Sequence, residues 1–183
     1  ENNPVMYELL CELPWREERF SKDEWLAGYV KARYGKSDAR LLEAWTLLSN
    51  TIYNCPPSSV QQGTHESVFC ARPSLKAYQA SSWSEMKDYY RPEDVIRAAG
   101  MMLECADSFR GNNNFEYDLV DVVRQAVAEK GRLVYPVVVA AFKSGDIELF
   151  ESASRRFLEL IMLQAELLAT RPEFKVGSRT ESA

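Results

Sequence analysis

The chain has 183 residues, of which 46% are hydrophobic and 27% are charged. This composition can bury a sizeable core and is not typical of intrinsic disorder. The net charge of -5 and the scattered Lys and Arg residues leave no basic surface for nucleic acid. The apolar runs at 133–142 and 160–168 are too short or too often interrupted to cross a bilayer, so no membrane span is expected.

The first predicted helix begins at Pro4. Asn3 supplies an N-cap side chain, and proline lacks only an N–H that the first turn leaves unpaired. Apolar residues at helical spacing continue until Pro14 stops the helix. The residues on this apolar stripe, which we expect to face inward, are Val5, Met6, Leu9, Leu10 and Leu13.

Two further helices are predicted before residue 54. Ser21 and Glu24 form a capping-box pattern that opens the second helix, and Gly35 is placed to end it. The third helix is predicted over 38–53, with one apolar side. Its inward residues are expected to be Leu41, Leu42, Trp45, Leu48 and Ile52. Three tryptophans lie on apolar stripes and are expected in the core, namely Trp15, Trp25 and Trp45.

Residues 54–90 lose the helical period and are rich in Pro, Ser, Gln, Gly and Thr. A connection of this length inside a compact domain is usually either functional or disordered. Its aromatic and cationic content favours an ordered loop, through His65, Arg72, Trp83, Tyr89 and Tyr90. The aromatic residues suit either stacking on a sugar ring or pinning the loop to the helices beneath it, and both interpretations are open.

The remaining sequence again has helical periodicity. Pro92 begins a helix whose inward residues are expected to be Val95, Ile96, Ala99, Met102 and Leu103. One long helix is predicted over 115–142, in which Gly131 and Pro136 should produce a kink or a break. A last helix follows Gly145 and Asp146 and ends near Thr170.

The sum of these elements is an all-α architecture, a bundle of antiparallel helices with one long ordered loop. One segment, 134–139, is β-branched enough to resemble a strand, but its helical flanks favour a helix.

The four cysteines have neither CxxC spacing nor the density of a disulfide scaffold. Cys11 and Cys105 lie on apolar helical faces, where we expect them to be buried as small hydrophobic side chains. Cys55 and Cys70 flank the polar loop. A disulfide between them in an oxidising compartment and two free thiols are both open.

Asp118 and Asp121 stand three residues apart on one helical face, with Arg124 one turn further. Paired carboxylates can perform acid–base chemistry or hold a hard cation, whereas an exposed ion pair is the plain alternative. A metal-dependent enzyme using these two carboxylates with His65 is therefore one hypothesis. No GxSxG, HExxH, P-loop or dinucleotide-binding fingerprint occurs in the sequence.

Several motifs, in this order, resemble the alpha-N-acetylglucosaminidases of glycoside hydrolase family 89. These motifs are NNPVMYEL (2–9), LPWR (13–16), WLAGYV (25–30), ARYG (32–35), AWTLL (44–48), YNC (53–55), RPSL (72–75), YDLVD (117–121) and RQAV (124–127). The resemblance implies an enzyme built from a small N-terminal domain, a TIM-like barrel and an all-α C-terminal domain. Enzymes of this family remove terminal alpha-linked N-acetylglucosamine with retention, which needs two carboxylates.

Under this resemblance, residues 1–16 are the end of the catalytic barrel domain, its last helix. Residues 17–183 are then the all-α C-terminal domain, truncated at its C-terminus. Both catalytic carboxylates lie upstream of residue 1, so no catalytic residue is expected here, and neither a metal nor another cofactor is implied. We expect this chain alone to be inactive and to expose two apolar faces, one toward the barrel and one toward missing helices.

The resemblance also implies binding residues, partners and a location. His65 and Arg72 fall where the family brings the loop toward the sugar pocket, so they are candidate substrate-binding residues. The implied partners are the barrel domain of the same chain and, through the full-length enzyme, glycans ending in N-acetylglucosamine. The implied location is secreted, periplasmic or cell-surface in a bacterium and lysosomal in a eukaryote. The alternative is a stand-alone helical interaction or ligand-binding module that uses the 54–90 loop as its working surface.

Overall fold

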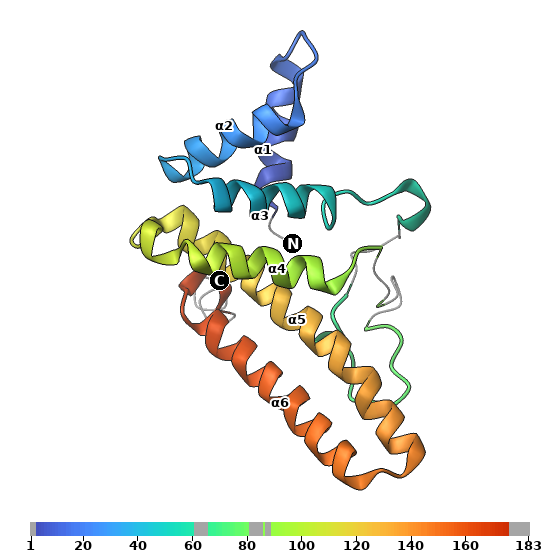
Figure 1. Ribbon diagram of the computed structural model, residues 1–183. Helices are drawn as coiled ribbons and strands as arrows, with labels where there is room; N and C mark the ends of the chain where they lie inside the picture. Colours follow the sequence, from blue (N-terminus) through green and yellow to red (C-terminus); the bar gives the residue numbers. More distant parts are fainter. Residues whose placement is uncertain (1–2, 61–65, 81–85, 87–88, 176–183) are drawn as a thin grey trace, which may run out of the picture.

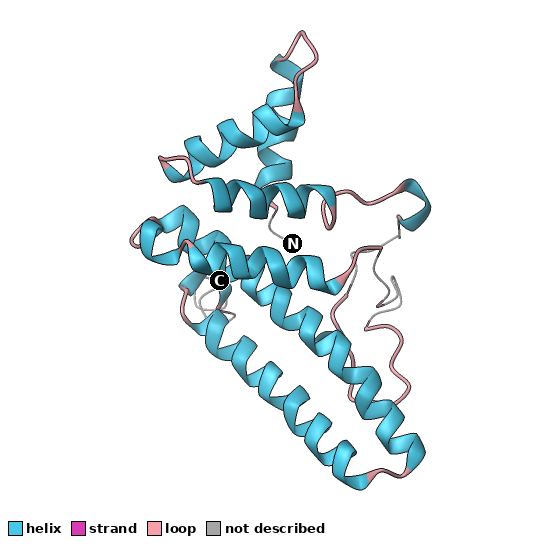
Figure 2. Ribbon diagram, viewed as in Figure 1, coloured by secondary structure: helices cyan, strands magenta, loops and turns pink. Residues whose placement is uncertain are grey.

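A computed structural model of the chain describes residues 3–60, 66–80, 86 and 89–175. Over these residues the fold is all-α, without a strand, as the sequence predicts (Figure 2). The α-helices are α1 (Pro4–Glu12), α2 (Lys22–Tyr34), α3 (Ala39–Asn50), α4 (Pro92–Glu104), α5 (Asn113–Ser144) and α6 (Ile147–Ala169). None of the described helices is both long and apolar enough to span a membrane.

The helices pack in the order of the chain (Figure 1). α2 contacts α3, α3 lies beside α4, and α4 packs on the N-terminal half of α5. α6 then runs back along α5, so that these two helices form a long antiparallel hairpin that extends away from the rest. The long connection between α3 and α4 carries two short 3-10 turns, at Pro57–Ser59 and Val68–Cys70, and the second of these turns contacts α5.

Short polar side chains fix where five of the helices begin. Each N-cap oxygen accepts a hydrogen bond from the backbone N–H three residues ahead, which satisfies a donor that the first turn leaves unpaired. The caps, with their N···O distances, are Asn3 to Met6 (3.1 Å), Ser21 to Glu24 (3.3 Å), Asp38 to Leu41 (2.9 Å), Asn112 to Phe115 (3.0 Å) and Asp146 to Leu149 (3.0 Å). Gly35 adopts a left-handed φ angle of 77° and ends α2 as predicted, and Gly145, with a φ angle of 72°, ends α5 in the same way.

α5 is continuous from Asn113 to Ser144, so Gly131 and Pro136 do not break the helix, and the alternative expectation, a kink at these residues, stays a prediction. Proline removes one backbone hydrogen bond, but Pro136 lies on an exposed face of α5, where water can reach the carbonyl that loses its donor. The β-branched segment 134–139 lies inside the same helix, which confirms the helical interpretation.

A core of apolar side chains joins α2, α3, α4 and the first half of α5. Trp25 and Trp45 are buried in it as predicted, and Trp45 is 1% exposed. Trp15 is 86% exposed, so its predicted burial is wrong. It follows Pro14 in the 3-10 turn Leu13–Trp15, beyond the end of α1, and none of the described elements covers it.

Several other residues assigned to the core from helical spacing are exposed. On α1 only Val5 is buried, and in α4 the side chain of Leu103 points outward. Cys11 is exposed, contrary to expectation, because it lies on the outer side of α1, whereas Cys105 is buried as predicted. Burial and the Asp38 carboxylate raise the pKa of the Cys105 thiol to about 11. Helical spacing thus identified most of each stripe, but it failed at Leu103 in α4 and along α1, which has little to pack against.

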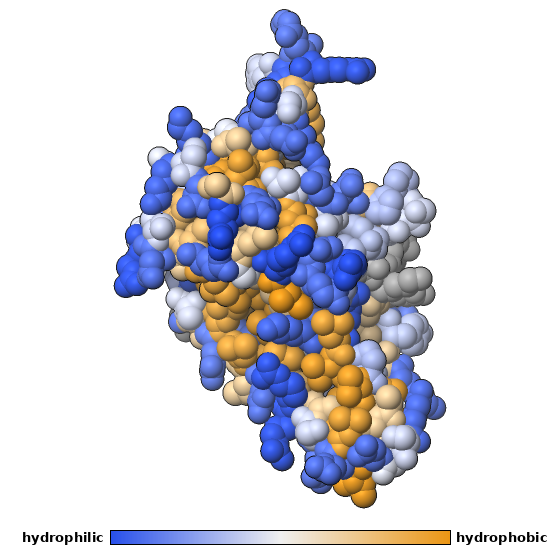
Figure 3. All heavy atoms as spheres, viewed as in Figure 1, coloured by the Kyte–Doolittle hydropathy of each residue, from blue (hydrophilic) through white to orange (hydrophobic). Residues whose placement is uncertain are grey.

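Two apolar surfaces are open to solvent, as expected from the sequence. The first, which we call the N-terminal surface, consists of Met6, Tyr7, Leu10, Leu13 and Trp15. The second, which we call the hairpin surface, consists of Leu133, Val137, Phe142, Ile147, Leu149, Leu158, Met162 and Leu163. Figure 3 shows apolar residues gathered over the α5–α6 hairpin on the face in view. Contiguous apolar surfaces of this kind mark interaction sites.

Candidate functional site

A cavity of about 530 Å³ opens between α1, the end of α3, α5 and the long connection. Its volume lies within the usual range for small-molecule sites. The polar residues that line it are Asn3, Tyr53, Glu66, Ser67, Cys70, Tyr89, Tyr90, Asp121, Arg124, Gln125, Glu129 and Arg132. The apolar lining comes from Met6, Leu48, Ile52, Val68, Val95, Val122 and Ala128.

One polar face of α5 forms a wall of the cavity. Asp121, Arg124, Gln125, Glu129 and Arg132 follow one another at spacings of three, one, four and three residues. These spacings place all five side chains on the same side of a helix. Glu129 and Arg132 were not identified from the sequence, although the helical spacing of the charged residues is visible there.

Glu129 is the centre of the hydrogen-bond network in this wall. Its side chain is 4% exposed. It accepts hydrogen bonds from the Tyr90 hydroxyl (2.8 Å), Gln125 Nε2 (2.7 Å) and Arg132 Nε (2.9 Å). A buried carboxylate is costly unless donors compensate its charge, and three donors from two segments do so here. The network therefore holds Tyr90, and with it the end of the long connection, against α5.

Asp121 and Arg124 form the i, i+3 ion pair expected from the sequence. Arg124 donates from two nitrogens to Asp121 Oδ1, at 2.7 and 3.2 Å. The two side chains are 15% and 28% exposed and both reach the cavity. The cavity thus presents acids and bases in pairs, without a strong excess of either charge.

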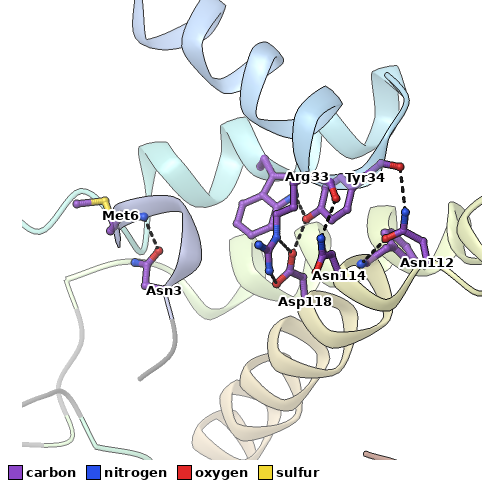
Figure 4. A network of polar contacts seen from close by, with 9 residues as sticks. Asn3, Met6, Arg33, Tyr34, Asn112, Asn114 and Asp118 are labelled. Carbon is purple, nitrogen blue, oxygen red and sulfur yellow. Dashed lines mark hydrogen bonds and ion pairs between the residues drawn. The ribbon is translucent and has the colours of Figure 1, made fainter. Parts of the chain in front are cut away.

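Asp118 does not join Asp121 in the cavity, so the paired-carboxylate hypothesis fails on geometry. Asp118 is 2% exposed and binds the Arg33 guanidinium, with Nη2–Oδ1 at 2.8 Å, and the Tyr34 hydroxyl at 2.7 Å (Figure 4). The Tyr34 oxygen also accepts a hydrogen bond from Trp45 Nε1 at 2.9 Å. Burial raises the pKa of the Asp118 carboxyl, and its hydrogen bonds with Arg33 and Tyr34 act in the opposite direction. Asp118 therefore anchors α5 to α2 and α3, and it does not belong to an exposed ion pair.

Two asparagines strengthen the same contact between α2 and α5. Asn112 Nδ2 donates to the Tyr34 carbonyl at 3.0 Å, and Asn114 Nδ2 donates to the Arg33 carbonyl at 3.1 Å (Figure 4). These carbonyls end α2 and lack helical partners, so the asparagines satisfy acceptors that the helix leaves open.

The candidate residues of the long connection have different outcomes. His65 and Trp83 lie outside the described residues. Arg72 is exposed and does not line the cavity. Tyr90 pins the connection to α5 through Glu129, whereas the Tyr89 hydroxyl donates to the Ile52 carbonyl in the turn that follows α3. The pinning interpretation is thus confirmed for Tyr90.

Neither a disulfide nor a metal centre is formed by the described part of the chain. Cys55 and Cys70 are both exposed free thiols. No group of three or more His, Cys, Asp and Glu side chains among the described residues is arranged to hold a metal ion. Since Asp118 is bound to Arg33, it is not free to join such a group.

Residues 25–183 match the sequence profile of the family described as alpha-N-acetylglucosaminidase (NAGLU) C-terminal domain. The chain belongs to this family. It is 33% identical over 183 residues to human alpha-N-acetylglucosaminidase, a match that covers 99% of this chain and 24% of the relative. The chain therefore spans about a quarter of the length of that enzyme, and the family match covers nearly all of the described helices.

Solved structures of the family 89 glycoside hydrolase from Clostridium perfringens share the fold. A variant of that enzyme with two Glu to Gln substitutions, in complex with its substrate GlcNAc-alpha-1,4-galactose, superposes with a TM-score of 0.93 at 35% identity. A second structure, in complex with 2-acetamido-1,2-dideoxynojirmycin, has a TM-score of 0.90 at 35% identity. The matches cover 99% and 96% of this chain and 20% of each enzyme. The all-α fold is thus the fold of the C-terminal part of a family 89 enzyme.

Proposed function

We propose that the chain is the C-terminal helical portion of a retaining exo-glycosidase that removes terminal alpha-linked N-acetylglucosamine. The catalytic carboxylates then lie upstream of residue 1, on a barrel domain. The observation that carries this proposal is the match of 99% of the chain, at a TM-score of 0.93, to an enzyme whose complex holds GlcNAc-alpha-1,4-galactose. This portion supports the barrel and contributes to the wall of the sugar pocket.

The cavity has the chemistry that a neutral sugar requires. On the α5 wall Arg124 holds Asp121 and Arg132 holds Glu129, so that these four charges balance and their donors and acceptors are fixed. Glu66 adds one further acid to the lining. Sugar hydroxyls bind to such preorganised groups, whereas a phosphate requires a basic excess. Asn3 lies at the cavity, beside the point where the proposed barrel domain precedes the chain.

The barrel domain is the proposed partner of the N-terminal surface. Met6, Tyr7, Leu10, Leu13 and Trp15 form this surface on α1 and the following turn. We assign residues 1–16 to the end of the barrel domain and residues 17–183 to the helical domain. α1 contributes a single buried residue, Val5, to the helical core, and the Trp25 indole donates to Glu12 at 2.9 Å across the boundary. This sparse contact supports an α1 that packs chiefly on another domain.

His65 and Arg72 remain candidate substrate-binding residues of the proposed enzyme, supported by their place in the long connection that borders the cavity. Because Arg72 is exposed, its side chain is available to a sugar or to the barrel domain. The proposed enzyme acts outside the cytoplasm, as a secreted, periplasmic or cell-surface protein in a bacterium or a lysosomal one in a eukaryote.

The test is an assay of the full-length gene product with a chromogenic alpha-N-acetylglucosaminide, alongside the 183-residue chain. We expect turnover from the full-length protein and none from the chain alone. In the full-length protein, Gln125→Ala should raise KM by about tenfold, because it removes the amide that holds Glu129 and Tyr90 in the cavity wall, and a loss of about 1.4 kcal/mol in binding corresponds to a factor of ten. Arg110→Ala, in the exposed turn before α5, is the matched control and should leave KM unchanged.

Two results would contradict the proposal. Turnover by the repurified 183-residue chain would place the carboxylates within it. A gene that encodes no barrel domain upstream of residue 1 would favour the alternative, a stand-alone ligand-binding module. The observation that favours this alternative is that α1, α3, α5 and the long connection by themselves enclose a cavity of about 530 Å³.

A further inference from the structure

The segment 66–70 forms part of the cavity wall and contacts α5. Glu66, Ser67, Val68 and Cys70 line the cavity, whereas Phe69 does not. Val68 is buried, and the segment turns tightly through the 3-10 helix Val68–Cys70. Phe69 thus points away from the cavity that its neighbours line.

The Phe69 ring sits in a slot on α5 that exists because residue 131 is glycine. A Cβ atom at Gly131 would lie 2.3 Å from Cε1 and 2.4 Å from Cζ of Phe69, far inside van der Waals contact. The ring also packs edge-on against Phe157 of α6, with centroids 5.3 Å apart at 70°. If the ring rotated away from a new Cβ, it would lose the position that it holds against Phe157.

Nothing in the backbone requires glycine at position 131. Gly131 lies in the interior of α5, and unlike Gly35, Gly111 and Gly145 it does not have a positive φ angle. Glycine in a helix interior is unfavourable relative to alanine. The close approach of Phe69 is the local feature that a larger residue would disrupt.

Hydrogen bonds within the segment couple the ring to the cavity wall. Ser67 Oγ accepts from the Phe69 N–H at 3.2 Å, and the Ser67 carbonyl accepts from the Cys70 N–H at 3.0 Å. The Val68 carbonyl accepts from the Ala71 N–H at 3.3 Å. These bonds hold 67–71 as one tight turn, so a shift of the Phe69 backbone that relieves the contact with a new Cβ would move the neighbouring side chains that face the cavity.

We propose that Phe69 and Gly131 are positioning residues, whose contact fixes the 66–70 wall of the cavity and thereby sets how tightly the cavity binds its sugar. The structural half of this proposal, that the contact fixes the 66–70 wall, does not depend on what the protein does. The binding half, that this wall sets the affinity for a sugar, rests on the proposed function. Each half therefore has its own measurement.

The first measurement is the thermal stability and amide hydrogen exchange of the 183-residue chain carrying Gly131→Ala. Helix propensity alone predicts a higher Tm for this variant. The slot predicts a lower Tm, by about 2–4 °C or more, and faster exchange at the amides of residues 69–71. Gly100→Ala in α4 is the matched control, because a Cβ there meets no atom within 4 Å, and its Tm should stay equal or rise.

A compensating substitution separates the slot from any other effect of the alanine. Leucine has no atoms at the Cε1 and Cζ positions, and the remaining Cδ1 position lies 3.3 Å from the point that an alanine Cβ would occupy at residue 131. The double variant Gly131→Ala with Phe69→Leu should therefore recover most of the amide protection that Gly131→Ala loses. A Gly131→Ala chain that is stabilised like Gly100→Ala, with unchanged exchange at 69–71, would overturn the proposal.

The second measurement is KM and kcat of the full-length protein with a chromogenic alpha-N-acetylglucosaminide. We expect Gly131→Ala to raise KM by about three- to tenfold with kcat unchanged, since a displaced wall weakens binding of substrate and transition state alike. Phe69→Leu in the same protein should restore KM. If exchange at 69–71 increases while KM stays constant, the binding half is overturned and the contact serves packing alone. If the wild-type protein shows no turnover, the proposed function fails while the exchange result still decides the structural half.

Discussion

The molecule has two regions that bury their apolar residues to very different degrees. The first region, α2 to α4 with the first half of α5, encloses a continuous core and the buried Asp118 contact. The second region, the hairpin of the second half of α5 with α6, buries Val138, Ala141, Ala153 and Leu160 but exposes the whole hairpin surface. Two helices can cover only one face of each other. The comparison shows that the first region buries its apolar stripes among its own helices, whereas the second region leaves one apolar face open to solvent.

The largest effect should come from Asp118→Ala in the first region. This substitution leaves Arg33 and the Tyr34 hydroxyl without their buried partner. Removing one member of a buried ion pair costs about 3–5 kcal/mol. Urea denaturation of the chain, followed by circular dichroism, measures this change in the free energy of unfolding.

Asp121→Ala is the matched control for Asp118→Ala. Asp121 pairs with Arg124 on the same helix and is partly exposed, so its loss should cost less than about 1 kcal/mol. Equal effects of the two substitutions would show that Asp118 does not anchor α5 to α2.

The next effect concerns the inner face of the hairpin. Leu160 is 1% exposed and Leu158 is 60% exposed, although both are leucines on α6. Leu160→Ala should cost about 2–4 kcal/mol through the cavity it creates, and Leu158→Ala should change stability by less than about 0.5 kcal/mol. A comparable loss for both would mean that the outer face of the hairpin is already covered, for example by a second copy of the chain.

A smaller effect is the pH dependence that Asp38 contributes to the first region. The Leu41 N–H, which bonds to Asp38 as its N-cap, lowers the pKa of this carboxyl. The pKa of Asp38 is lower in the folded chain than in the unfolded chain. The stabilisation by the Asp38 cap is therefore fully present above the ordinary pKa of about 4. It is lost as the pH falls through the lowered pKa. The chain should therefore lose about 1 kcal/mol relative to the Asp38→Asn variant between pH 5 and pH 2. A constant difference between the two proteins would exclude this role.

Charged residues placed on the hairpin surface should have the smallest effect on stability. Their main effect should be on how strongly this surface binds apolar molecules. Leu158→Glu with Met162→Lys should leave the Tm within about 2 °C and reduce the binding of an apolar fluorescent dye. The same pair of charges should impair the full-length protein if other helices cover this surface there. Unchanged dye binding would show that the open apolar surface lies elsewhere.

Local signals in the sequence predicted most helix boundaries but not which helices have partners. Ser21 and Asp38 mark helix starts through hydrogen bonds that reach three residues ahead, and Gly35 ends α2 through its left-handed φ angle. The exposure of Trp15 depends on what packs against α1, which no local spacing records. Gly131 was interpreted as a helix breaker because its partner, Phe69, lies 62 residues earlier in the chain. The cavity wall at Glu129 was missed for the same reason. A charged helical face has the same sequence pattern whether it faces water or packs against a distant loop.

The long connection also has a consequence for how the chain folds. α4, α5 and α6 follow one another through short turns, whereas α3 reaches α4 only after residues 51–91 close a loop. Closure of a loop costs entropy that grows with its length and must be repaid before distant contacts form. We therefore expect α4 to α6 to assemble first and α1 to α3 to dock afterwards, so that the cavity between them forms in the last step of folding.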